Sequence, residues 1–349
     1  MPVTVVVGGQ FGSEGKGKVA HLLAARLGVE VAVRVGGSNS GHTVINEAGE
    51  RFVLRHLPTP ALLPHVVSVL PPGCYIDVPV LLEEVRRLGL EPDRLVIDPK
   101  ATVVGPDEKS SEAASTLRER IGSTQSGTGA ALARRVARDG SVTLAQDVPD
   151  LQRFVRHTLP LLRATLKGGR RVLIEGTQGY GLSVLHSPHY PYATSRETTA
   201  AGALAESGLS PLDVDQVVLV VRAFPIRVAG NSGPLANELT WDAVRKLGHH
   251  DHDLTEYTSV TGGIRRVAAF DPSIVQAAIA ANAPTTVVMN HLDYVDHSAC
   301  EAGHLTPAIA EFVSRVEDSI GRNLDLIGVG ARLLAPGRVR EPRFVQAIG

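Results

Sequence analysis

The chain has 349 residues, of which 43% are hydrophobic and 20% are charged, and its formal net charge is −1. This length and composition predict a large α/β protein with a sizeable core and exclude a disordered chain, while the scattered lysines and arginines argue against a nucleic-acid-coating surface. Two cysteines without a pairing pattern, and the lack of a basic leader or of an apolar run of membrane-spanning length, predict a cytoplasmic protein with no membrane partner.

Strand-like and helix-like runs alternate along the chain. Strands are expected at 4–7, 31–35, 171–174, 216–221, 285–289 and 326–329, and helices at 16–27, 79–88, 108–120, 273–281 and 307–320. This alternation predicts a mostly parallel central sheet flanked by helices. Glycine-rich or polar loops follow four of the strands, and ligands of such sheets bind beyond the carboxyl ends of the strands. We therefore expect one large polar cleft.

The first of these loops, residues 8–18, reads GGQFGSEGKGK between an apolar strand and a helix. Backbone N–H groups at a helix start, together with Lys16, suit a polyphosphate. The loop is not a standard Walker A sequence, because five residues separate Gly9 from Gly15 and Gly17 replaces the magnesium-binding hydroxyl. The loop therefore predicts a phosphate site of another family.

The second loop, residues 36–43, reads GGSNSGHT and offers Asn39 and His42. His42 beside a phosphate loop is a candidate donor to a phosphate or to an oxyanion on the acceptor. On its own the segment is more typical of a histidine that satisfies loop backbone groups. The neighbouring phosphate loop favours the functional interpretation.

A third segment, residues 122–129, reads GSTQSGTG and precedes a helical run at 130–140. Its hydroxyls and backbone amides suit a second anion site the size of a monophosphate, with Arg134, Arg135 and Arg138 on the adjoining helix. A flexible surface loop beside a solvated basic helix is an equally good interpretation.

Polar loops in the second half of the chain extend this pattern. Gln178, in EGTQGYG, is able to read a purine edge, and Thr194, in YPYATSRETTAA, is a candidate phosphate donor, although such side chains often only form turns. Residues 258–266, TSVTGGIRR, suit a mobile clamp on a carboxylate. The segment MNHLD at 289–293 resembles the N/T-K-x-D guanine reader with His291 in place of lysine.

The segment HHDHD at 249–253 invites interpretation as a metal site. Structural zinc sites usually have ligands separated by a fixed turn, so an exposed polar loop is the favoured interpretation.

Taken together, the segments resemble adenylosuccinate synthetase over nearly the whole chain and in order. The family motif G-D-E-G-K-G-K appears as GSEGKGK at 12–18, G-H-T as residues 41–43, E-G-A-Q-G as 175–179, Y-P-Y-x-T-S as 190–195, T-T-G-R-x-R as 260–265 and T-K-L-D as 290–293. The resemblance implies a P-loop-NTPase-like fold and a single domain over 1–349, of the compact type seen in archaeal and phage forms.

The resemblance also implies a reaction: aspartate is joined to C6 of a 6-oxopurine nucleotide after the γ-phosphate of a nucleoside triphosphate (NTP) has activated O6. It implies Ser13, Lys16 and His42 as catalytic positions, Mg²⁺ held at Ser13 and Gly41, and a homodimer in which Arg138 reaches the partner's acceptor. The implied donor site comprises Gly12, Glu14, Gly15, Lys16, Gly17, Lys18, Gly41, His42, Thr43, Arg265, Asn290, His291, Asp293, Gly328 and Gly330. The implied acceptor site comprises Ser13, Asn39, Ser123, Thr124, Gln178 and Thr194, and the implied aspartate site comprises Val260, Thr261, Gly262 and Arg265.

Departures from the family pattern bear on the substrate. Ser13 replaces the catalytic aspartate, and Gly263 replaces an arginine near the ribose and aspartate. Serine frees volume beside C2 of the purine, where guanine carries an amino group, and loss of the arginine is compatible with deoxyribose. Both changes favour dGMP and resemble the phage branch of the family, the 2-aminoadenylosuccinate synthetases, in which case the location is the host cytoplasm. Synthesis from IMP with GTP, and a nucleotide-binding homologue without catalysis, are the alternatives.

The donor is left open by the sequence. Asp293 favours guanine, whereas His291 and the segment Gly328-Val329-Gly330, in place of S-T-G, favour relaxed choice or adenine. ATP or dATP is the expectation, because a cell that converts dGMP gains from a donor outside the guanine pool.

Overall fold

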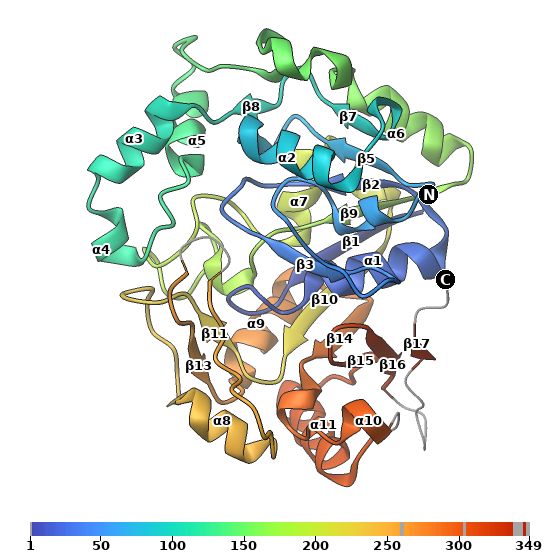
Figure 1. The fold of residues 1–349 in the computed structure, drawn as a ribbon, viewed down its shortest axis with the longest axis vertical. Coiled ribbons are helices and arrows are strands. Elements are labelled where there is room, and N and C mark those ends of the chain that lie inside the picture. The colour runs from blue at the N-terminus through green and yellow to red at the C-terminus, as the bar shows by residue number, and fades with distance from the viewer. Residues whose placement is uncertain (1, 259–261, 303–304, 338–344, 347–349) are drawn as a thin grey trace.

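One large sheet organises the protein (Figure 1). The computed structural model describes residues 2–258, 262–302, 305–337 and 345–346. Within these residues ten strands lie in the order β17-β16-β15-β14-β10-β1-β9-β2-β5-β7. The strands from β15 to β7 pair in parallel, whereas β16 and β17 extend one edge with antiparallel pairs.

The strands of this sheet are short and mostly apolar. In spatial order they are β17 (Val345–Gln346), β16 (Leu333–Pro336), β15 (Leu326–Val329), β14 (Thr286–Asn290), β10 (Val214–Arg222), β1 (Val3–Gly8), β9 (Arg171–Glu175), β2 (Val29–Arg34), β5 (Val67–Leu70) and β7 (Leu95–Ile97). Three small sheets complete the set: β11 (Ile226–Arg227) with β13 (Arg266–Ala268) and β12 (Glu238–Leu239); β3 (His42–Ile45) with β4 (Arg51–Leu54); and β6 (Tyr75–Ile76) with β8 (Thr102–Val103).

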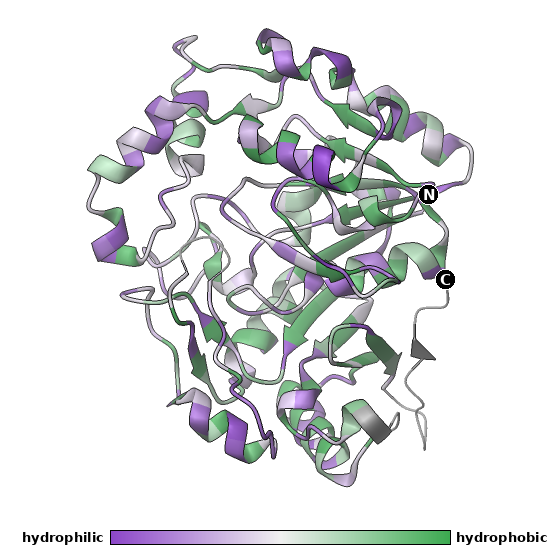
Figure 2. Cartoon of the chain, in the orientation of Figure 1, coloured by the Kyte–Doolittle hydropathy of each residue, from purple (hydrophilic) through white to green (hydrophobic). Residues whose placement is uncertain are grey.

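Helices cover the sheet. They are α1 (Lys16–Leu27), α2 (Val78–Leu88), α3 (Pro106–Ala114), α4 (Leu117–Ile121), α5 (Thr128–Ala137), α6 (Thr158–Lys167), α7 (Ala200–Ser207), α8 (Trp241–Leu247), α9 (Pro272–Asn282), α10 (Ala299–Ala302) and α11 (Pro307–Ile320), with 3₁₀ turns η1 (Thr59–Leu62), η2 (Pro92–Arg94), η3 (Ala145–Asp147), η4 (Pro149–Phe154), η5 (Tyr180–Leu182), η6 (Pro211–Asp213) and η7 (Leu292–Tyr294). Hydrophobic residues gather on the central strands, and the outer helices carry hydrophilic residues (Figure 2).

Strand β1 shows why the sheet needs near-continuous apolar runs. Successive side chains of a strand point to opposite faces. Val5 and Val7 pack in the largest core cluster, whereas Val6 packs on the other face with Val19 and Ala20 of α1. Both faces are covered, so every position of β1 is buried. The predicted parallel α/β fold is therefore confirmed.

One predicted helix, 108–120, is wrong as a single element. The structure breaks it into α3 and α4 at Ser115, whose backbone is extended (φ −84°, ψ 161°). The Ser115 hydroxyl donates to the Glu112 carbonyl at 2.6 Å and accepts from Leu117 N–H at 3.3 Å. The side chain thus competes with the helical backbone bonds, as serine often does.

The four loops named from the sequence follow β1, β2, β9 and β14, so they meet at the carboxyl edge of neighbouring parallel strands. The expected clustering of these loops is confirmed. Among the described residues, no helix has both the length and the apolar character that crossing a bilayer would require.

Candidate active site

The first loop curls around a carboxylate of its own. Glu14 is fully buried, and its Oε1 accepts from the backbone N–H groups of Gln10 at 3.1 Å and Gly12 at 2.8 Å. Its Oε2 lies 2.6 Å from Lys16 Nζ. Both side chains therefore face the inside of the loop. The Gln10 and Gly12 amides, which were expected to bind a phosphate, donate to Glu14 in this structure.

Glycine is required at Gly17, the position that would carry a hydroxyl in a Walker A loop. A Cβ there would lie 2.8 Å from the Thr43 carbonyl oxygen and 2.9 Å from Thr59 Cγ2. Thr59 also donates its hydroxyl to the Gly17 carbonyl at 2.8 Å. Close packing of α1 against β3 and η1 therefore explains this departure from the standard motif.

Ser13 stands at the rim of the loop and is exposed. Its backbone adopts the left-handed conformation (φ 59°), between Gly12 and Gly15, which also have positive φ. Arg222, at the end of β10, donates to the Ser13 carbonyl at 3.1 Å. The loop geometry thus presents residue 13 to solvent, and its side chain is an uncharged hydroxyl.

His42 belongs to a buried network at the ends of β2 and β9. Glu175 Oε1 lies 2.6 Å from Arg34 Nη1 and 2.5 Å from His42 Nδ1, and Glu175 Oε2 accepts from Thr59 N–H at 2.8 Å. Burial acts to raise the pKa of Glu175, but Arg34 and the His42 bond outweigh it and hold that pKa below its usual range. Glu175 is therefore an anion that orients the imidazole.

The imidazole of His42 is neutral in this state. Burial, and then the nearby Arg34 charge, lower the pKa of His42 to about 3. With Nδ1 directed at Glu175, Nε2 is buried and has no hydrogen-bond partner among the described residues. That nitrogen belongs to a ring on the cavity wall, and in the neutral ring it can only accept a hydrogen bond, so it would donate to a phosphate or an oxyanion only after taking up a proton.

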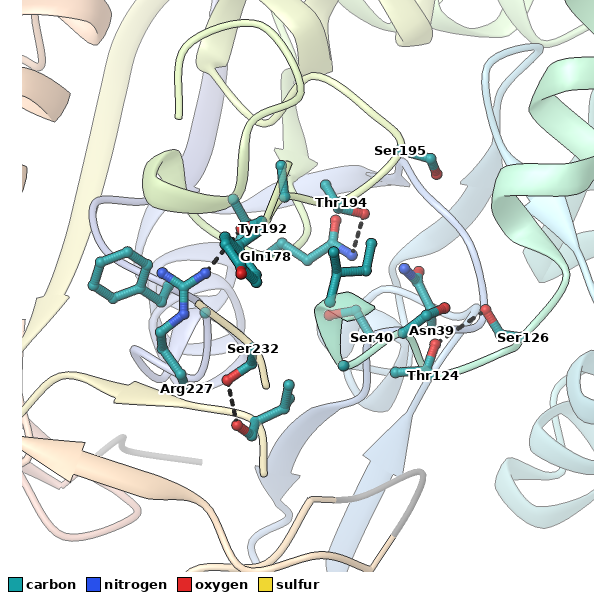
Figure 3. A pocket seen from close by; sticks show the side chains of 18 of the residues that line it. Asn39, Ser40, Thr124, Ser126, Gln178, Tyr192, Thr194, Ser195, Arg227 and Ser232 are labelled. Carbon is teal, nitrogen blue, oxygen red and sulfur yellow. Dashed lines mark hydrogen bonds between the residues drawn. The ribbon is translucent and has the colours of Figure 1, made fainter. Parts of the chain in front are cut away.

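A cavity of about 410 Å³ opens between the first loop, the 122–129 segment and the loops after β9. Figure 3 shows Gln178 in its centre, donating to the Thr194 hydroxyl at 2.9 Å, with Asn39 and Thr124 opposite. Asn39 Oδ1 is buried and unpaired among the described residues. Polar groups of this kind around a concave space of 300–1,000 Å³ are typical of small-ligand sites.

Most of the predicted acceptor residues meet in this cavity. Its lining includes Gly12, Ser13, Asn39, Gly41, His42, Ser123, Thr124, Gln178, Thr194 and Arg265. Sequence reasoning missed Arg227 and Tyr192 on the same wall, where the Arg227 guanidinium donates to the Tyr192 carbonyl at 2.8 Å (Figure 3).

The 122–129 segment differs from the predicted anion loop in one respect. The backbone amides of Gly127, Gly129 and Ala130 donate to the Glu112 carboxylate at 2.8, 2.7 and 3.2 Å. The expectation that backbone amides of this loop are available to a phosphate is wrong for these three, because a buried carboxylate of α3 takes them. The hydroxyls of Ser123 and Thr124 remain on the cavity wall.

The three arginines of the adjoining helix have different surroundings. Arg134 pairs with Glu108 at 2.6 Å, and Arg135 donates to the Lys100 carbonyl at 2.6 Å. Arg138 lies just past α5 in the left-handed C-cap position (φ 58°), is exposed, and makes no ion pair or hydrogen bond within the described part of the chain. It does not line the cavity of its own subunit.

A second charged network lies behind Ser13, and sequence reasoning missed it. Arg222 is fully buried and pairs with Glu256 at 2.5 Å, and Arg265 Nη1 reaches the same carboxylate at 2.7 Å. Burial opposes ionisation of Glu256, but Arg222 overrides it and holds the pKa of Glu256 well below its usual range. Glu256 thereby links Arg265 to Arg222, whose guanidinium also donates to the Ser13 carbonyl.

Of the predicted aspartate loop, Val260 and Thr261 lie outside the described residues. Gly262 is exposed with φ 68°, and Gly263 N–H donates to the Thr258 hydroxyl at 3.0 Å. Thr258 and Arg265 both line the cavity.

The predicted base-reading residues sit at the other end of the first loop. Asn290 is buried and donates to the Glu14 carbonyl at 2.9 Å, which ties β14 to the loop. Asp293 Oδ1 accepts from Gly330 N–H at 2.8 Å, and Lys18 donates to the Gly330 carbonyl at 3.0 Å. Burial lowers the pKa of Lys18 to about 8. Burial and the nearby Arg222 charge also lower the pKa of His291.

Glycine at 328 has a packing reason. A Cβ there would lie 2.3 Å from Asn290 Oδ1 and 2.6 Å from Lys18 Nζ. Serine at this position would displace both side chains from the contacts just described, so Gly328 is matched to Asn290 and Lys18.

Sequence comparison finds relatives along nearly the whole chain. The sequence model of the adenylosuccinate synthetase family matches residues 5–147 and 142–301. The adenylosuccinate synthetase of Thermococcus onnurineus is 34% identical over 340 residues, covering 95% of this chain and 97% of the relative, and that of Methanocaldococcus jannaschii is 33% identical over 337 residues, covering 95% and 94%.

Solved structures give the same fold. The succinoaminodeoxyadenylate synthetase of cyanophage S-2L, bound to dGMP and to dATP as an energy donor, matches with a TM-score of 0.80 and 31% identity over 95% of this chain and 93% of that one. The fully ligated adenylosuccinate synthetase of Plasmodium falciparum matches with a TM-score of 0.81, 21% identity, and coverage of 95% and 98%. The chain thus belongs to the adenylosuccinate synthetase family, the ligases that form a C–N bond between aspartate and a purine nucleotide at the expense of a nucleoside triphosphate.

Proposed function

We propose that the protein condenses L-aspartate with C6 of dGMP, giving 2-aminodeoxyadenylosuccinate for the synthesis of diaminopurine DNA. The observation that carries the proposal is the chemistry of the cavity wall at Ser13, which presents a neutral hydroxyl to the space beside Asn39 and Gln178. Among the described residues that line the cavity, Glu112 is the only carboxylate, and both of its oxygens accept backbone amides. A purine with a 2-amino group therefore meets neither a bulky nor a charged side chain at residue 13.

Two further features support a deoxyguanosine acceptor. Gly263 has no side chain, so position 263 offers no cation of its own to a 2′-hydroxyl. The cyanophage relative, similar over 95% of this chain, was solved with dGMP in its site.

The proposed chemistry has two displacements. The purine O6 attacks the γ-phosphorus of the NTP while N1 gives up its proton to a water held by Ser13 or to a phosphate oxygen, and the nucleoside diphosphate leaves. The aspartate amine then attacks C6, phosphate leaves with the O6 oxygen, and the amine loses a proton. His42 would donate to the transferring phosphoryl group from Nε2 after proton uptake, because a phosphate dianion nearby raises an imidazole pKa. Lys16 would follow the phosphates once they compete with Glu14, and Thr261 and Arg265 would close on aspartate.

Mg²⁺ fits the oxygen donors at this place. The Ser13 hydroxyl and the Gly41 carbonyl belong to residues on the cavity wall, and Mg²⁺ prefers oxygen ligands completed by water and substrate phosphates. When bound there, it would neutralise charge on the phosphates. Loss of activity in a chelator and its return with added Mg²⁺ is the expected result.

We infer that the donor is ATP or dATP. Asp293 Oδ1 already accepts Gly330 N–H, so a guanine that used both oxygens of Asp293 would share one of them with the loop. His291 replaces the lysine of the guanine-reading motif, and the cyanophage relative was solved with dATP as donor.

A homodimer is also proposed. Arg138 is exposed, unpaired within the described residues and outside its own cavity, which suits a guanidinium that completes the acceptor site of a second subunit. A protein that sediments as a monomer with acceptor bound would contradict this inference.

An acceptor and donor panel tests the proposal. The protein is incubated with aspartate, Mg²⁺ and each pair drawn from dGMP, GMP or IMP and ATP, dATP or GTP, and the succinyl product is identified by mass. We expect product from dGMP with ATP or dATP. Product from IMP alone would overturn the acceptor assignment, and nucleotide binding without phosphate release from any pair would show a non-catalytic homologue.

Paired variants at residue 13 separate charge from volume. Aspartate and asparagine tolerate the left-handed backbone equally well and have nearly equal size. We expect both Ser13→Asp and Ser13→Asn to lower kcat/KM for dGMP at least about 10-fold, the effect of about 1.4 kcal/mol, and only Ser13→Asp to raise turnover of IMP. If Ser13→Asp retains wild-type use of dGMP, residue 13 does not set acceptor choice.

A further inference from the structure

Three histidines come together on the far side of the base-reading loop, outside the cavity described above. His250 and His252 belong to the HHDHD segment that follows α8, and His297 follows η7. One ligand nitrogen from each lies within 4.8 Å of the others. The sequence pattern alone favoured an exposed polar loop, because HHDHD lacks the fixed turn that usually separates zinc ligands. His297 lies 45 positions after His252 and is not part of that pattern.

His250 is set up as a ligand by its surroundings. The side chain is 5% exposed, and its Nε2 lies 2.8 Å from the Asp293 carbonyl oxygen, so Nε2 carries the proton and donates. The Nδ1 lone pair is then buried with no partner among the described residues. A ring whose Nε2 donates to a backbone carbonyl, whose Nδ1 is buried without a partner among the described residues, and which packs beside two other imidazoles has the arrangement of a metal-binding histidine with its outer-sphere partner.

The other two rings are positioned to complete the site. The His252 Nδ1 is 2.9 Å from Asp251 Oδ1, which leaves Nε2 as the free lone pair, and the ring is more than half exposed. His297 packs with its ring centroid 4.5 Å from that of His250 and 5.4 Å from that of His252. Bonds of about 2.0–2.1 Å to zinc require nitrogens about 3.4 Å apart, so nitrogens that now lie within 4.8 Å of one another would have to approach by up to about 1.4 Å when the metal binds.

The backbone beneath the cluster is braced. His250 N–H donates to the Arg245 carbonyl at 3.0 Å, Arg245 donates back to the His250 carbonyl at 3.2 Å, and His297 N–H donates to the Gly248 carbonyl at 3.0 Å. The end of α8 and the segment after η7 are thus already joined without a metal. Such preorganisation limits the ordering cost of binding.

We propose that His250, His252 and His297 form a zinc-binding site, with water from the exposed side as the fourth ligand. Three imidazoles suit Zn²⁺ and disfavour Mg²⁺, which prefers oxygen ligands, so this site is separate from the ion of the ligase reaction. Because His250 donates to the Asp293 carbonyl, bound zinc would brace the loop that faces the donor base.

Untagged protein, stripped with chelator, tests the site by titration with Zn²⁺ and by the visible absorption of Co²⁺ as a probe. We expect one Zn²⁺ per chain and a tetrahedral Co²⁺ spectrum. His252→Ala and His297→Ala, at exposed or half-buried positions, should each raise the zinc Kd by at least about 10–100-fold, the effect of losing even an outer-sphere partner. His249→Asn is the matched control, because His249 lies outside the cluster and asparagine tolerates its left-handed backbone (φ 56°).

Two results would overturn the proposal: wild-type protein that retains no zinc against dialysis, or equal affinity in wild type, His252→Ala and His297→Ala. Circular dichroism of each variant shows whether it is folded. Neither readout depends on turnover, so the ligase assignment is not at stake.

Discussion

His56 links the stability of this fold to pH through one hydrogen bond. The side chain is 2% exposed, and its Nε2 accepts the backbone N–H of Asp77 at 3.0 Å. Protonation of that nitrogen would destroy the acceptor and bury a charge. Burial, followed by the nearby charges of Arg55 and Arg34, lowers the pKa of His56 from 6.5 to about 3.

Proton linkage gives the direction and the size of the change in stability with pH. Below pH 6.5 the unfolded chain takes up a proton at residue 56 that the folded chain does not, so the stabilisation present above pH 6.5 is lost progressively as the pH falls toward 3. Because the pKa of His56 is 6.5 in the unfolded chain and about 3 in the folded one, the free energy of unfolding falls by about 1.4 kcal/mol when the pH is lowered from 7.5 to 5.5.

Urea unfolding of wild type and His56→Gln at the two pH values measures this cost. Glutamine keeps an acceptor for Asp77 N–H but does not titrate. We expect wild type to lose about 1.4 kcal/mol more than the variant on going from pH 7.5 to 5.5. His65→Gln, at an exposed site, should leave the wild-type pH dependence unchanged. Identical losses in wild type and His56→Gln would refute the reasoning.

Two further substitutions test the networks at the site. Glu175→Gln leaves the buried Arg34 without its counter-charge and should destabilise the protein by about 3–5 kcal/mol in urea unfolding. Glu83→Gln, in an exposed pair with Arg86, is the control and should have almost no effect. Equal effects of the two substitutions would contradict the network. Gly328→Ser should raise the KM for the NTP and leave the KM for the acceptor unchanged, because the added side chain meets Asn290 and Lys18. Ala331→Ser, at an exposed position, is the control. An unchanged KM for the NTP would show that Asn290 and Lys18 accommodate the hydroxyl.

Local sequence pattern was sufficient for the architecture around the site. Apolar runs closed by glycine-rich or polar loops identified β1, β2, β9, β10, β14 and β15, and parallel order then placed the loops at one edge. The short strands β5 and β7 were not singled out, because segments of three or four residues are too short for a periodicity that distinguishes strand from buried helix. Helix 108–120 failed because one serine side chain competes with the backbone.

The charged networks were beyond local pattern because their members lie far apart in the chain. Arg34 and Glu175 are 141 positions apart, and Arg222 and Glu256 are 34 apart. A signal was nevertheless present: Arg34, Glu175 and Arg222 each end a strand directly after a run of at least three apolar residues. A charge at the carboxyl end of a parallel strand reaches the ligand edge of the sheet, so such residues are candidates for a buried network.

Two carboxylates that hold glycine-rich segments bear on ligand binding. Glu14 within the first loop, and Glu112 of α3 beside the 122–129 segment, accept backbone amides with oxygens that resemble those of a phosphate. A phosphate that takes these amides must therefore displace an anion of the protein. The affinity for nucleotide then depends on how much more strongly these amides bind phosphate than they bind the glutamate. A neutral residue in place of either glutamate would leave the loop less ordered and would let it bind phosphate more tightly.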